Sequence, residues 1–378
     1  MKEGTLLTVF NDHNESGIIL AKKYKFENII VAECNVHKEE IFDNLVEIYK
    51  ENNNDSNIEI VKENIESIID RFKGKENRLI INLTLNDTLK ALKLLYKCKE
   101  LNIDGVYVDI PKKKEYWFKK NLNILEEELV DLDIEEIFKS NGNNIISHEC
   151  RLTNDNQILD FAKIIYENMD IWHKYKQRLY DTEIFSHDYN NQRIVTINKE
   201  KLCDEEKTIL FKVISNLKKL NLIDVEEDKS IKVTFLNDYL KGFIFKSGTW
   251  LEILTESIVK EINSIDDVKS GVVFMWNELH GNIKNELDVV AIKDSVMVCI
   301  SCKDSAKYDE NTLNELKVYS DRIGGEISKK ILIATKKPNK SSVIDRAREM
   351  GIHLVILDRD INIFKKTLEN IINKITQD

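Results

Sequence analysis

Short apolar runs rich in β-branched residues alternate with longer amphipathic stretches over the first 110 residues, and this alternation limits the possible folds more than any other feature. The five runs, about 15 to 25 residues apart, are TLLTVF, NIIVAE, IEIVKE, RLIINLT and GVYVDI. Strands that alternate with helices build a parallel sheet with helices on its faces. We therefore expect a Rossmann-like α/β fold in this part of the chain.

The length of 378 residues exceeds what a single hydrophobic core usually supports, which favours several domains. We place the first domain at residues 1–152, where a charged and mostly helical segment over 112–150 ends in a short strand, NNIISHE. A helical connector follows at 153–240, and a second α/β domain occupies 241–378.

The connector begins with a long helical stretch from Asn154 to about Tyr180 and continues over 204–235 as a helix, a turn and a hairpin. The second pattern is typical of a winged helix, a fold that often binds DNA. The segment that would enter the DNA groove is only weakly basic, which favours a structural connector.

The net charge of −10 argues against a protein coated with basic residues for nucleic-acid binding. The charge is uneven, because residues 241–378 carry 21 Lys and Arg against 21 Asp and Glu. Nucleic-acid contact is therefore expected in the last third of the chain. A basic cluster lies there, formed by Lys336, Lys337, Lys340, Arg346 and Arg348. The alternative is that this cluster is an ordinary solvated surface.

The cellular location follows from what the sequence lacks. No apolar run reaches the roughly 18 residues needed to span a bilayer, and the start MKEGTLLTVF does not have the layout of a signal peptide. The six cysteines show no spacing typical of a disulfide-rich secreted protein. We therefore expect a cytoplasmic protein with reduced thiols.

Polar residues directly follow the first and fourth apolar runs. In a doubly wound sheet, ligands bind beyond the carboxyl ends of the strands, where a helix N-terminus can receive phosphate. The first run lacks the GxGxxG pattern, which argues against a dinucleotide but leaves another nucleotide open. The same residue types also cap helices, so capping is the alternative for each. The candidate ligand residues are Asn11, Asp12, His13, Asn14, Thr84, Asn86, Asp87 and Thr88.

The last third of the chain carries residues suited to catalysis. A helix in GTWLEILTESIVKEI places Glu252 near its first turn, and two strands in NELDVVAIKDSVMVCISCKDS are joined by a turn at 293–295. This hairpin can bring Asp288 and Lys303 together on adjacent strands. Carboxylates hold divalent cations that polarise a phosphate and activate a water, while a lysine stabilises developing negative charge. The pattern therefore predicts phosphodiester hydrolysis.

The order of the helix with GTWLE, the strands NELDVV and ISCK, a further helix and the strand KKILIAT resembles the restriction-endonuclease-like PD-(D/E)xK nuclease core. Within that fold, NELDVVAIKDSVMVCISCKD looks like the nuclease half of the CRISPR ancillary effectors that join a CARF domain to such a nuclease. The segments TVFNDHNE and INLTLNDTLKAL resemble the two ligand-binding segments of a CARF domain, the second keeping Asn82, Thr84, Thr88 and Lys90.

This resemblance implies a homodimer that binds a cyclic oligoadenylate made by a type III CRISPR complex and then cuts nucleic acid. A two-fold symmetric ring suits an isologous dimer, in which two identical surfaces share one ligand. Cyclic tetra-adenylate is the favoured activator, cyclic hexa-adenylate is the alternative, and Mn²⁺ or Mg²⁺ is the expected metal. The expected reactions are cleavage of single-stranded DNA or RNA and nicking of duplex DNA.

The same resemblance gives roles to individual residues. Asp288 would be the metal-binding aspartate, Lys303 the catalytic lysine and Glu252 the acid carried by the helix. The main-chain carbonyl of Cys302 would be a further metal ligand, as that position is in the fold.

The sequence departs from the family pattern at one position, because Ser301 stands where a glutamate usually precedes the lysine by two residues. The missing carboxylate could come from Glu286, which shares a strand face with Asp288, or from Glu315 on the following helix. Both alternatives remain open at this point.

Three weaker interpretations compete with this site. Cys299 and Cys302 could form half of a zinc site, but residues three apart on a strand point to opposite faces and no second pair exists. His280, in a turn before the NELD strand, could contact phosphate, although a surface histidine is the more frequent finding. The third is a ligand-responsive DNA-binding regulator with a catalytically degenerate nuclease domain, which Ser301 favours.

Overall fold

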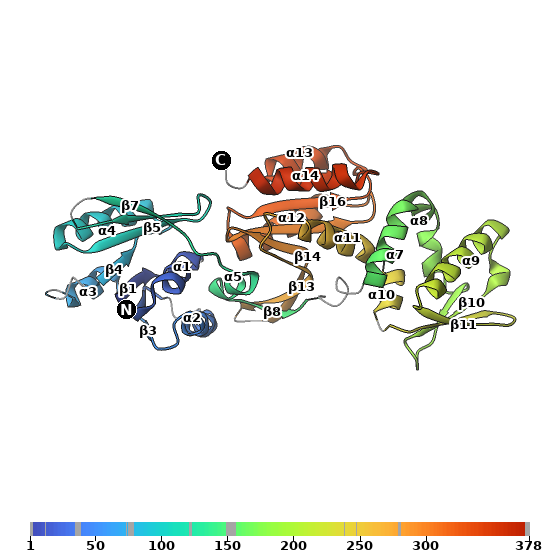
Figure 1. Cartoon of the computed structure of the whole chain (residues 1–378), viewed down its shortest axis with the longest axis horizontal. Coiled ribbons are helices and arrows are strands. Elements are labelled where there is room, and N and C mark those ends of the chain that lie inside the picture. Colours follow the sequence, from blue (N-terminus) through green and yellow to red (C-terminus); the bar gives the residue numbers. More distant parts are fainter. Residues whose placement is uncertain are drawn as a thin grey trace.

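The computed structural model describes residues 3–11, 13–34, 39–72, 74, 79–120, 123–148, 156–237, 239–246, 248–278 and 281–374. The chain forms three bodies in a row, with the C-terminal α/β domain between the N-terminal domain and the connector (Figure 1). The order in space therefore differs from the order in sequence, and the C-terminal domain contacts both of the others. None of the described helices has the length and apolar character that a membrane span requires.

The five predicted runs of the N-terminal half are confirmed as strands of one sheet, ordered β3-β2-β1-β4-β5-β6-β7. Neighbouring strands from β3 to β5 are parallel, as the Rossmann-like prediction requires. These strands are β1 (Glu3–Val9), β2 (Phe26–Ala32), β3 (Asn57–Ile60), β4 (Leu79–Asn82) and β5 (Asp104–Asp109). The helices between them are α1 (Glu15–Tyr24), α2 (Glu39–Asn52), α3 (Ile65–Arg71) and α4 (Thr88–Leu101).

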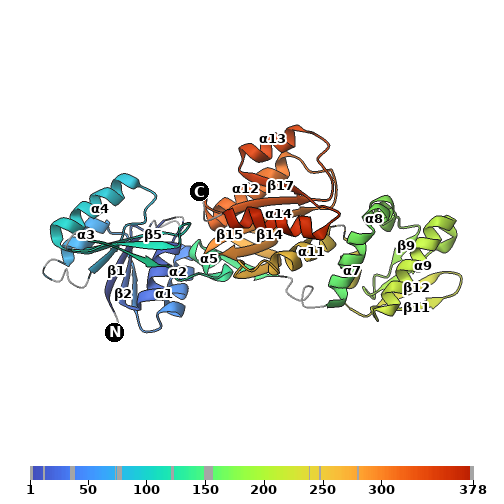
Figure 2. The ribbon, with the colours of Figure 1, turned by 45° about the horizontal axis from the view of Figure 1, so that its top comes forward.

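Helices cover both faces of this sheet, with α1 and α2 on one face and α3 and α4 on the other (Figure 2). Successive side chains of a strand point to opposite faces. Leu6 of β1 accordingly joins the core that contains Ile18, while Leu7 joins the core that contains Ile65 and Leu94. The alternation read from the sequence therefore produces a doubly wound layer structure.

The prediction that residues 112–150 are mostly helical is wrong. The segment contains two strands, β6 (Lys114–Phe118) and β7 (Ile124–Glu128), which extend the sheet in antiparallel fashion beyond β5. Every residue of β7 is exposed, so its run of acids has no apolar face to mark it as a strand. The strand is held by pairing with β6, where Lys114 lies opposite Glu128. Tertiary pairing here overrides the helical preference of a Glu-rich segment.

The strand predicted to close the first domain belongs to the C-terminal sheet instead. β8 (Asn143–Ser147) pairs with β13 (Asp267–Glu278), so a boundary at residue 152 divides two strands of one sheet. The preceding helix, α5 (Ile134–Ser140), also packs on β13. The rings of Phe138 and Phe274 meet edge to face, with their centroids 5.5 Å apart. An unpaired sheet edge must be covered, and β8 covers the edge of β13.

The connector is a separate body at the far end of the molecule (Figure 1). The helix, turn and hairpin predicted over 204–235 are confirmed as α9 (Asp204–Lys219), β11 (Ile223–Glu227) and β12 (Ile231–Phe235). The strands β10 (Ile194–Ile197) and β9 (Phe185–His187) complete a sheet ordered β11-β12-β10-β9.

The helical stretch predicted to Tyr180 is confirmed but is divided by a turn at Asn168. Its parts are α7 (Asn156–Glu167), α8 (Met169–Tyr175) and the 3₁₀ helix η3 (Lys176–Tyr180). Two further short helices lie in the connector, η4 (Lys199–Lys201) and α10 (Leu240–Phe245).

The C-terminal domain is built on six strands ordered β17-β16-β15-β14-β13-β8. The strands β13, β14 and β15 are antiparallel, whereas β15, β16 and β17 are parallel. The predicted turn between β14 and β15 is confirmed, since Asp294 (φ 50°) and Ser295 (φ 65°) have the left-handed values of a two-residue hairpin turn. The remaining strands are β14 (Gly281–Lys293), β15 (Val296–Lys303), β16 (Lys329–Ala334) and β17 (Ile352–Ile356).

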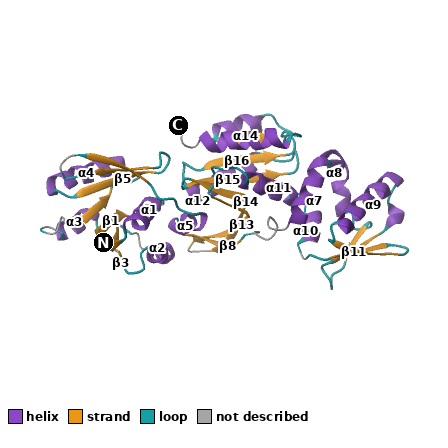
Figure 3. Cartoon of the chain, viewed as in Figure 1, coloured by secondary structure: helices purple, strands orange, loops and turns teal. Residues whose placement is uncertain are grey.

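Helices also enclose this sheet on both faces (Figure 3). One core contains residues of α11 (Thr249–Lys260) and α14 (Ile361–Asn373), and the other contains residues of α12 (Glu310–Gly324) and α13 (Ser342–Glu349). Cys302 and Cys299 illustrate the division, because the first lies in the α11 core and the second in the α12 core.

Candidate nuclease site and ligand-binding loops

A fork between two strands forms the centre of the C-terminal domain. The hairpin register runs from Lys293 opposite Val296 to Val289 opposite Ile300. Beyond that pair, β14 continues against β13 and β15 continues against β16. The two strands therefore separate where Asp288 follows on β14, and a space opens between them.

The carboxylate of Asp288 bridges the two strands at the start of this fork. Its Oδ2 accepts hydrogen bonds from the Ser301 hydroxyl at 3.0 Å and from the main-chain N–H of Cys302 at 2.6 Å. The ammonium of Lys303 lies 3.5 Å from the same oxygen. The hairpin thus joins the carboxylate and the lysine as the sequence predicts, and Ser301 is a direct partner of Asp288.

A polar cavity of about 340 Å³ occupies the fork. The strand β14 contributes Glu286 and Asp288, and β15 contributes Ser301 and Lys303. The helix α12 forms the opposite wall with Thr312, Glu315, Leu316 and Tyr319. Both candidates for the missing carboxylate, Glu286 and Glu315, therefore line the same cavity as Asp288.

Glu252 is not among the residues that line this cavity. It lies in the first turn of α11, which packs on the other face of the sheet. Its charge acts on the thiol of Cys302, whose Sγ lies 3.7 Å from the hydroxyl of Thr255 on the same helix. Glu252 therefore approaches the Cys302 position from the face opposite to Lys303.

The electrostatics of the fork keep Lys303 positively charged. Burial disfavours its charge, but the carboxylate of Asp288 and the more distant carboxylate of Glu315 outweigh that effect, so the pKa of Lys303 is raised above its usual value. The side chains of Lys303 and Asp288 are 35% and 18% exposed, respectively, so both can meet a ligand in the cavity.

The two cysteines of β15 are buried thiols. Burial raises the pKa of Cys299 to about 11, and it raises the pKa of Cys302 well above its usual value. Both are therefore protonated at neutral pH, whereas zinc binds the thiolate. His280, the other competing candidate, lies outside the described residues.

The cavity offers oxygen donors to a hard cation. Among the described residues, no group of three or more His, Cys, Asp or Glu side chains is arranged to hold a metal ion. Mg²⁺, however, keeps several waters and usually takes only one or two protein carboxylates together with substrate phosphates. Asp288, with Glu286 or Glu315 in the same cavity, supplies a donor set of that kind.

The predicted ligand residues of the N-terminal domain meet at one edge of its sheet, because β1 and β4 are neighbours. Asn82 is buried there and donates to the hydroxyls of Thr8 at 3.1 Å and Ser16 at 2.9 Å. Its Oδ1 accepts from the N–H of Thr84, and the Thr84 hydroxyl accepts from the N–H of Val108. These two residues hold the strand end together.

Two more of the predicted residues are also used within the fold. Asp87 caps α4 by accepting from the N–H of Lys90 at 3.1 Å, which is the capping alternative. Asn14 accepts from the N–H of Asn11 and donates to the carbonyl of Ser140. The exposed members of the set are Asn86, Asp87 and Thr88, of which Asp87 is used as a cap, while Asn11, His13 and Thr84 are half-buried and Asp12 lies outside the described residues.

The loop after β1 also contacts the end of α12. Asn141 donates to the carboxylate of Glu15 at 2.7 Å and to the main-chain carbonyl of Ile323. The ring of His13 lies against Gly325, where an added Cβ would come within 3.4 Å of it. Gly325 also has a φ of 70°, so a side chain there is disfavoured twice. The predicted ligand loop is therefore packed on the nuclease domain.

A buried carboxylate next to Lys303 was not predicted from the sequence. Asp304 accepts hydrogen bonds from the indoles of Trp172 at 2.7 Å and Trp250 at 3.0 Å. His173 lies 2.8 Å from its other oxygen, and the ammonium of Lys176 lies 3.0 Å away. Three of these partners come from the connector, more than 120 residues away in sequence, so no local pattern could identify the cluster.

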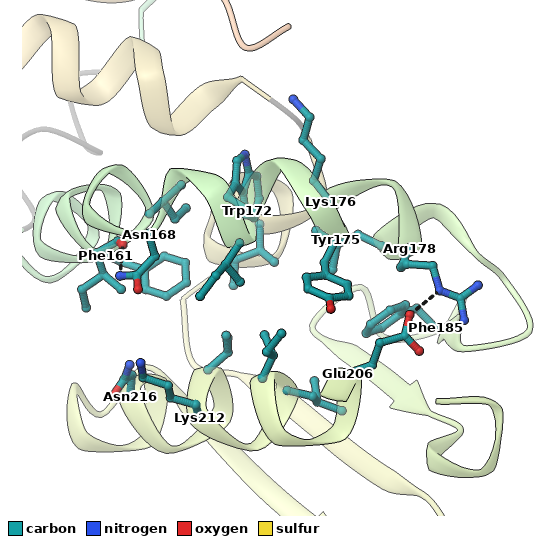
Figure 4. A pocket seen from close by; sticks show the side chains of 18 of the residues that line it. Phe161, Asn168, Trp172, Tyr175, Lys176, Arg178, Phe185, Glu206, Lys212 and Asn216 are labelled. Carbon is teal, nitrogen blue, oxygen red and sulfur yellow. Dashed lines mark hydrogen bonds and ion pairs between the residues drawn. The ribbon is translucent and has the colours of Figure 1, made fainter. Parts of the chain in front are cut away.

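A second, largely apolar cavity of about 190 Å³ lies within the connector (Figure 4). It is enclosed by α7, α8 and α9, and an ion pair between Arg178 and Glu206 closes one end. Figure 4 shows Tyr175 pointing into this space, while Lys176 reaches away from α9. The segment formed by α8 and η3 therefore has one side in the connector and another directed at the nuclease domain.

A Rossmann-like N-terminal domain and an α/β C-terminal domain with a polar cavity are thus joined in one chain. Residues 241–375 match the family described as "Card1-like, endonuclease domain". The chain as a whole is thus an enzyme with an endonuclease domain. No curated protein matches the sequence.

Three solved structures share the fold at low sequence identity. Protein VC1899 from Vibrio cholerae has a TM-score of 0.74 at 16% identity, covering 99% of this chain and 97% of that one. Can2 from Sulfobacillus thermosulfidooxidans, in complex with cyclic tetra-adenylate, has a TM-score of 0.67 at 17% identity, covering 98% and 99%. A type III CRISPR defence DNA nuclease activated by cyclic oligoadenylate has a TM-score of 0.52 at 12% identity, covering 91% of this chain and 48% of that one.

Proposed function

We propose that this chain is a metal-dependent endonuclease of type III CRISPR antiviral defence that is activated by a cyclic oligoadenylate. One observation carries the proposal: Asp288 and Lys303 lie together in an open polar cavity of a Card1-like endonuclease domain. The proposed substrates are single-stranded DNA or RNA, and duplex DNA is nicked.

The reaction is a hydrolysis of a phosphodiester bond. Asp288 would hold Mn²⁺ or Mg²⁺ together with the carbonyl of Cys302, and the cation would polarise the phosphate and lower the pKa of the attacking water. The carboxylate of Asp288 outweighs burial and raises the pKa of Lys303, and the ammonium would stabilise negative charge on the phosphate. Ser301 donates to Asp288 and fixes its orientation.

We further propose Glu286 as the carboxylate that replaces the one absent at Ser301. Glu286 lies on the same strand as Asp288 and lines the same cavity. Glu315 accepts a hydrogen bond from Tyr319 at 2.9 Å, so part of its accepting capacity is already used. Glu252 would contribute negative charge near Cys302 from the other face of the sheet.

The activator would be cyclic tetra-adenylate, with cyclic hexa-adenylate as the alternative, bound at the edge where β1 and β4 end. The exposed Asn86 and Thr88, at the start of α4, and the half-buried Asn11 and His13 are the groups available to it. The N-terminus of a helix favours phosphate. A two-fold ring shared by a homodimer would use this edge from both subunits.

Helix α12 offers a direct route from this edge to the cutting site. Its last turn is held by Asn141 and lies against His13, while Thr312 and Glu315 near its start line the catalytic cavity. Its 15 residues span about 22 Å. A ligand that moves the loop after β1 would therefore act on one wall of the cavity, which is how a ring could shift the enzyme toward its active state.

A cleavage assay tests the proposal. Supercoiled plasmid and labelled single strands are incubated with Mn²⁺ or Mg²⁺, with and without cyclic tetra-adenylate or cyclic hexa-adenylate. Cleavage that requires both a ring and a metal supports the proposed enzyme. Ring binding without cleavage under any condition would instead support a ligand-responsive nucleic-acid-binding regulator, the alternative that Ser301 favours.

A further inference from the structure

The connector reaches the nuclease site through one buried carboxylate. Asp304 directly follows Lys303 in sequence, and its side chain is only 1% exposed. Its neighbour in the chain, Lys303, is fixed at the main chain by a hydrogen bond from the N–H of Thr335. The position of Asp304 therefore limits where the backbone of Lys303 can lie.

The partners of Asp304 come from three separate parts of the fold. The connector contributes Trp172, His173 and Lys176 from α8 and the following 3₁₀ helix. Trp250 donates from α11, and the hydroxyl of Thr335 donates from the end of β16 at 3.0 Å.

Both oxygens of the Asp304 carboxylate are held by partners. Oδ2 accepts from the indoles of Trp172 and Trp250, while Oδ1 accepts from the hydroxyl of Thr335 and lies 2.8 Å from the His173 ring. A buried carboxylate with this many partners is fixed in one geometry, because each lost hydrogen bond would leave a polar group unsatisfied.

We propose that Asp304 is a positioning residue for Lys303, and that the connector is part of the cutting machinery because its helix α8 supplies the donors that hold Asp304. This inference rests on the proposed nuclease function. The weakly basic α9 does not indicate a DNA-binding role for the connector. The inference gives the connector another role, which is to fix the end of β15 from which Lys303 projects.

The position of η3, which directly follows α8, supports this role. Lys176 reaches away from the connector's own cavity (Figure 4), and it donates to the main-chain carbonyl of Asp304 as well as pairing with its carboxylate. The connector therefore holds both the backbone and the side chain of the residue after the lysine. A displacement of a catalytic group by about 1 Å can lower the rate of an enzyme by roughly 100-fold.

The test removes single donors. Thr335→Val deletes the 3.0 Å hydrogen bond from within the nuclease domain and keeps the shape of the side chain, whereas Trp172→Phe deletes the 2.7 Å hydrogen bond to Asp304 and also makes the ring smaller. With saturating ring and metal, we expect kcat on a labelled single strand to fall about tenfold in Trp172→Phe and less in Thr335→Val. KM for the strand and the Kd for the ring should stay within twofold.

The matched control is Tyr166→Phe, which removes a hydrogen bond between the same two bodies that does not involve Asp304. The Tyr166 hydroxyl donates to the main-chain carbonyl of Asp358 at 2.8 Å. We expect kcat of this variant to stay within twofold of the wild type. An equal loss of kcat in Tyr166→Phe and Trp172→Phe would mean that loosening the junction in general lowers activity, and it would overturn the specific role of Asp304.

A double-mutant cycle decides whether the effect passes through Lys303. If Asp304 positions Lys303, Trp172→Phe should cost much less in a Lys303→Met background than in the wild type, because the ammonium is no longer there to be misplaced. Full additivity would overturn the inference. An inactive wild type would refute the proposed function itself, whereas an active wild type with unchanged kcat in both donor variants would refute only the role of Asp304.

Discussion

The strand ends of the N-terminal sheet and the fork of the C-terminal sheet carry similar polar residues but use them differently. At the first, Asn82 and Asn14 satisfy neighbouring hydroxyls and main-chain groups. At the second, Asp288 and Lys303 border an open cavity. The difference arises because β1 and β4 stay side by side, whereas β14 and β15 separate. Polar side chains at a strand end thus remain accessible to a ligand where the two neighbouring strands separate.

The strongest way to break this comparison is to remove the carboxylate of the fork. Asp288→Ala should lower ring-activated cleavage at least ~10³-fold, because it removes the proposed metal ligand and several kcal/mol of charge stabilisation. Single-turnover cleavage measures this loss, and ring binding should be unchanged. Residual activity near that of the wild type would show that the fork is not the cutting site.

Lys303 sharpens the comparison through its charge. Lys303→Met should lower cleavage about 100-fold, and Lys303→Arg should lower it less, because arginine keeps the positive charge. The raised pKa means that the contribution of Lys303 to stability is complete below the unfolded pKa and is lost as the pH rises through the folded pKa.

The pH dependence of Lys303 follows from that sign. The ammonium stays charged across neutral pH, so the rates of the wild type and of Lys303→Arg should depend on pH in the same way between about pH 6 and 9. If the cleavage rate depends on pH in the wild type but not in Lys303→Arg, this lysine is the base.

The parallel strands of the first 110 residues and the hairpin of the fork could be predicted from the sequence, because strand periodicity and a turn are local signals. Asp288 and Lys303 were found for that reason. Asp304 was missed because its partners Trp172 and His173 lie 132 and 131 residues away. The placement of β8 at the edge of β13 failed for the same reason, since pairing between distant segments leaves no local pattern.

Substitution of the carboxylate proposed to replace the one absent at Ser301 should have a smaller effect on cleavage. Glu286→Gln should raise the metal concentration needed for half-maximal cleavage about tenfold, and Glu315→Gln should raise it less. A metal titration of cleavage measures both. Ser301→Glu should restore metal use in the Glu286→Gln background, because it supplies a carboxylate opposite Asp288. A larger effect of Glu315→Gln would reverse the assignment.

The contact between the two regions should matter for activation more than for cutting. Asn141→Leu removes both hydrogen bonds that tie Glu15 to the end of α12, so the ratio of rates with and without ring should fall several-fold. The matched control is Asn52→Leu, which removes a bridge between α2 and Glu136 of α5 without reaching α12. Equal effects of the two variants would exclude α12 as a specific route.

At the N-terminal strand ends, substitution of a structural residue should lower stability, whereas substitution of a ligand-facing residue should weaken ring binding. Asn82→Ala breaks two buried hydrogen bonds, so we expect a loss of about 1–3 kcal/mol of stability, measured as a lower melting temperature with and without ring. Thr88→Ala should leave the melting temperature unchanged and weaken ring binding by roughly fivefold. Normal ring affinity in Thr88→Ala would place the ligand elsewhere.

The most direct test of the central claim is a titration of Mn²⁺ into the wild type and into Asp288→Asn, followed by calorimetry or by the signal of free Mn²⁺ in electron paramagnetic resonance. A metal-dependent nuclease site at the fork predicts one or two Mn²⁺ per chain in the wild type and their loss in the variant, with both proteins folded. Equal Mn²⁺ binding by the two proteins, or none by the wild type with ring and uncleaved nucleic acid present, would contradict the account.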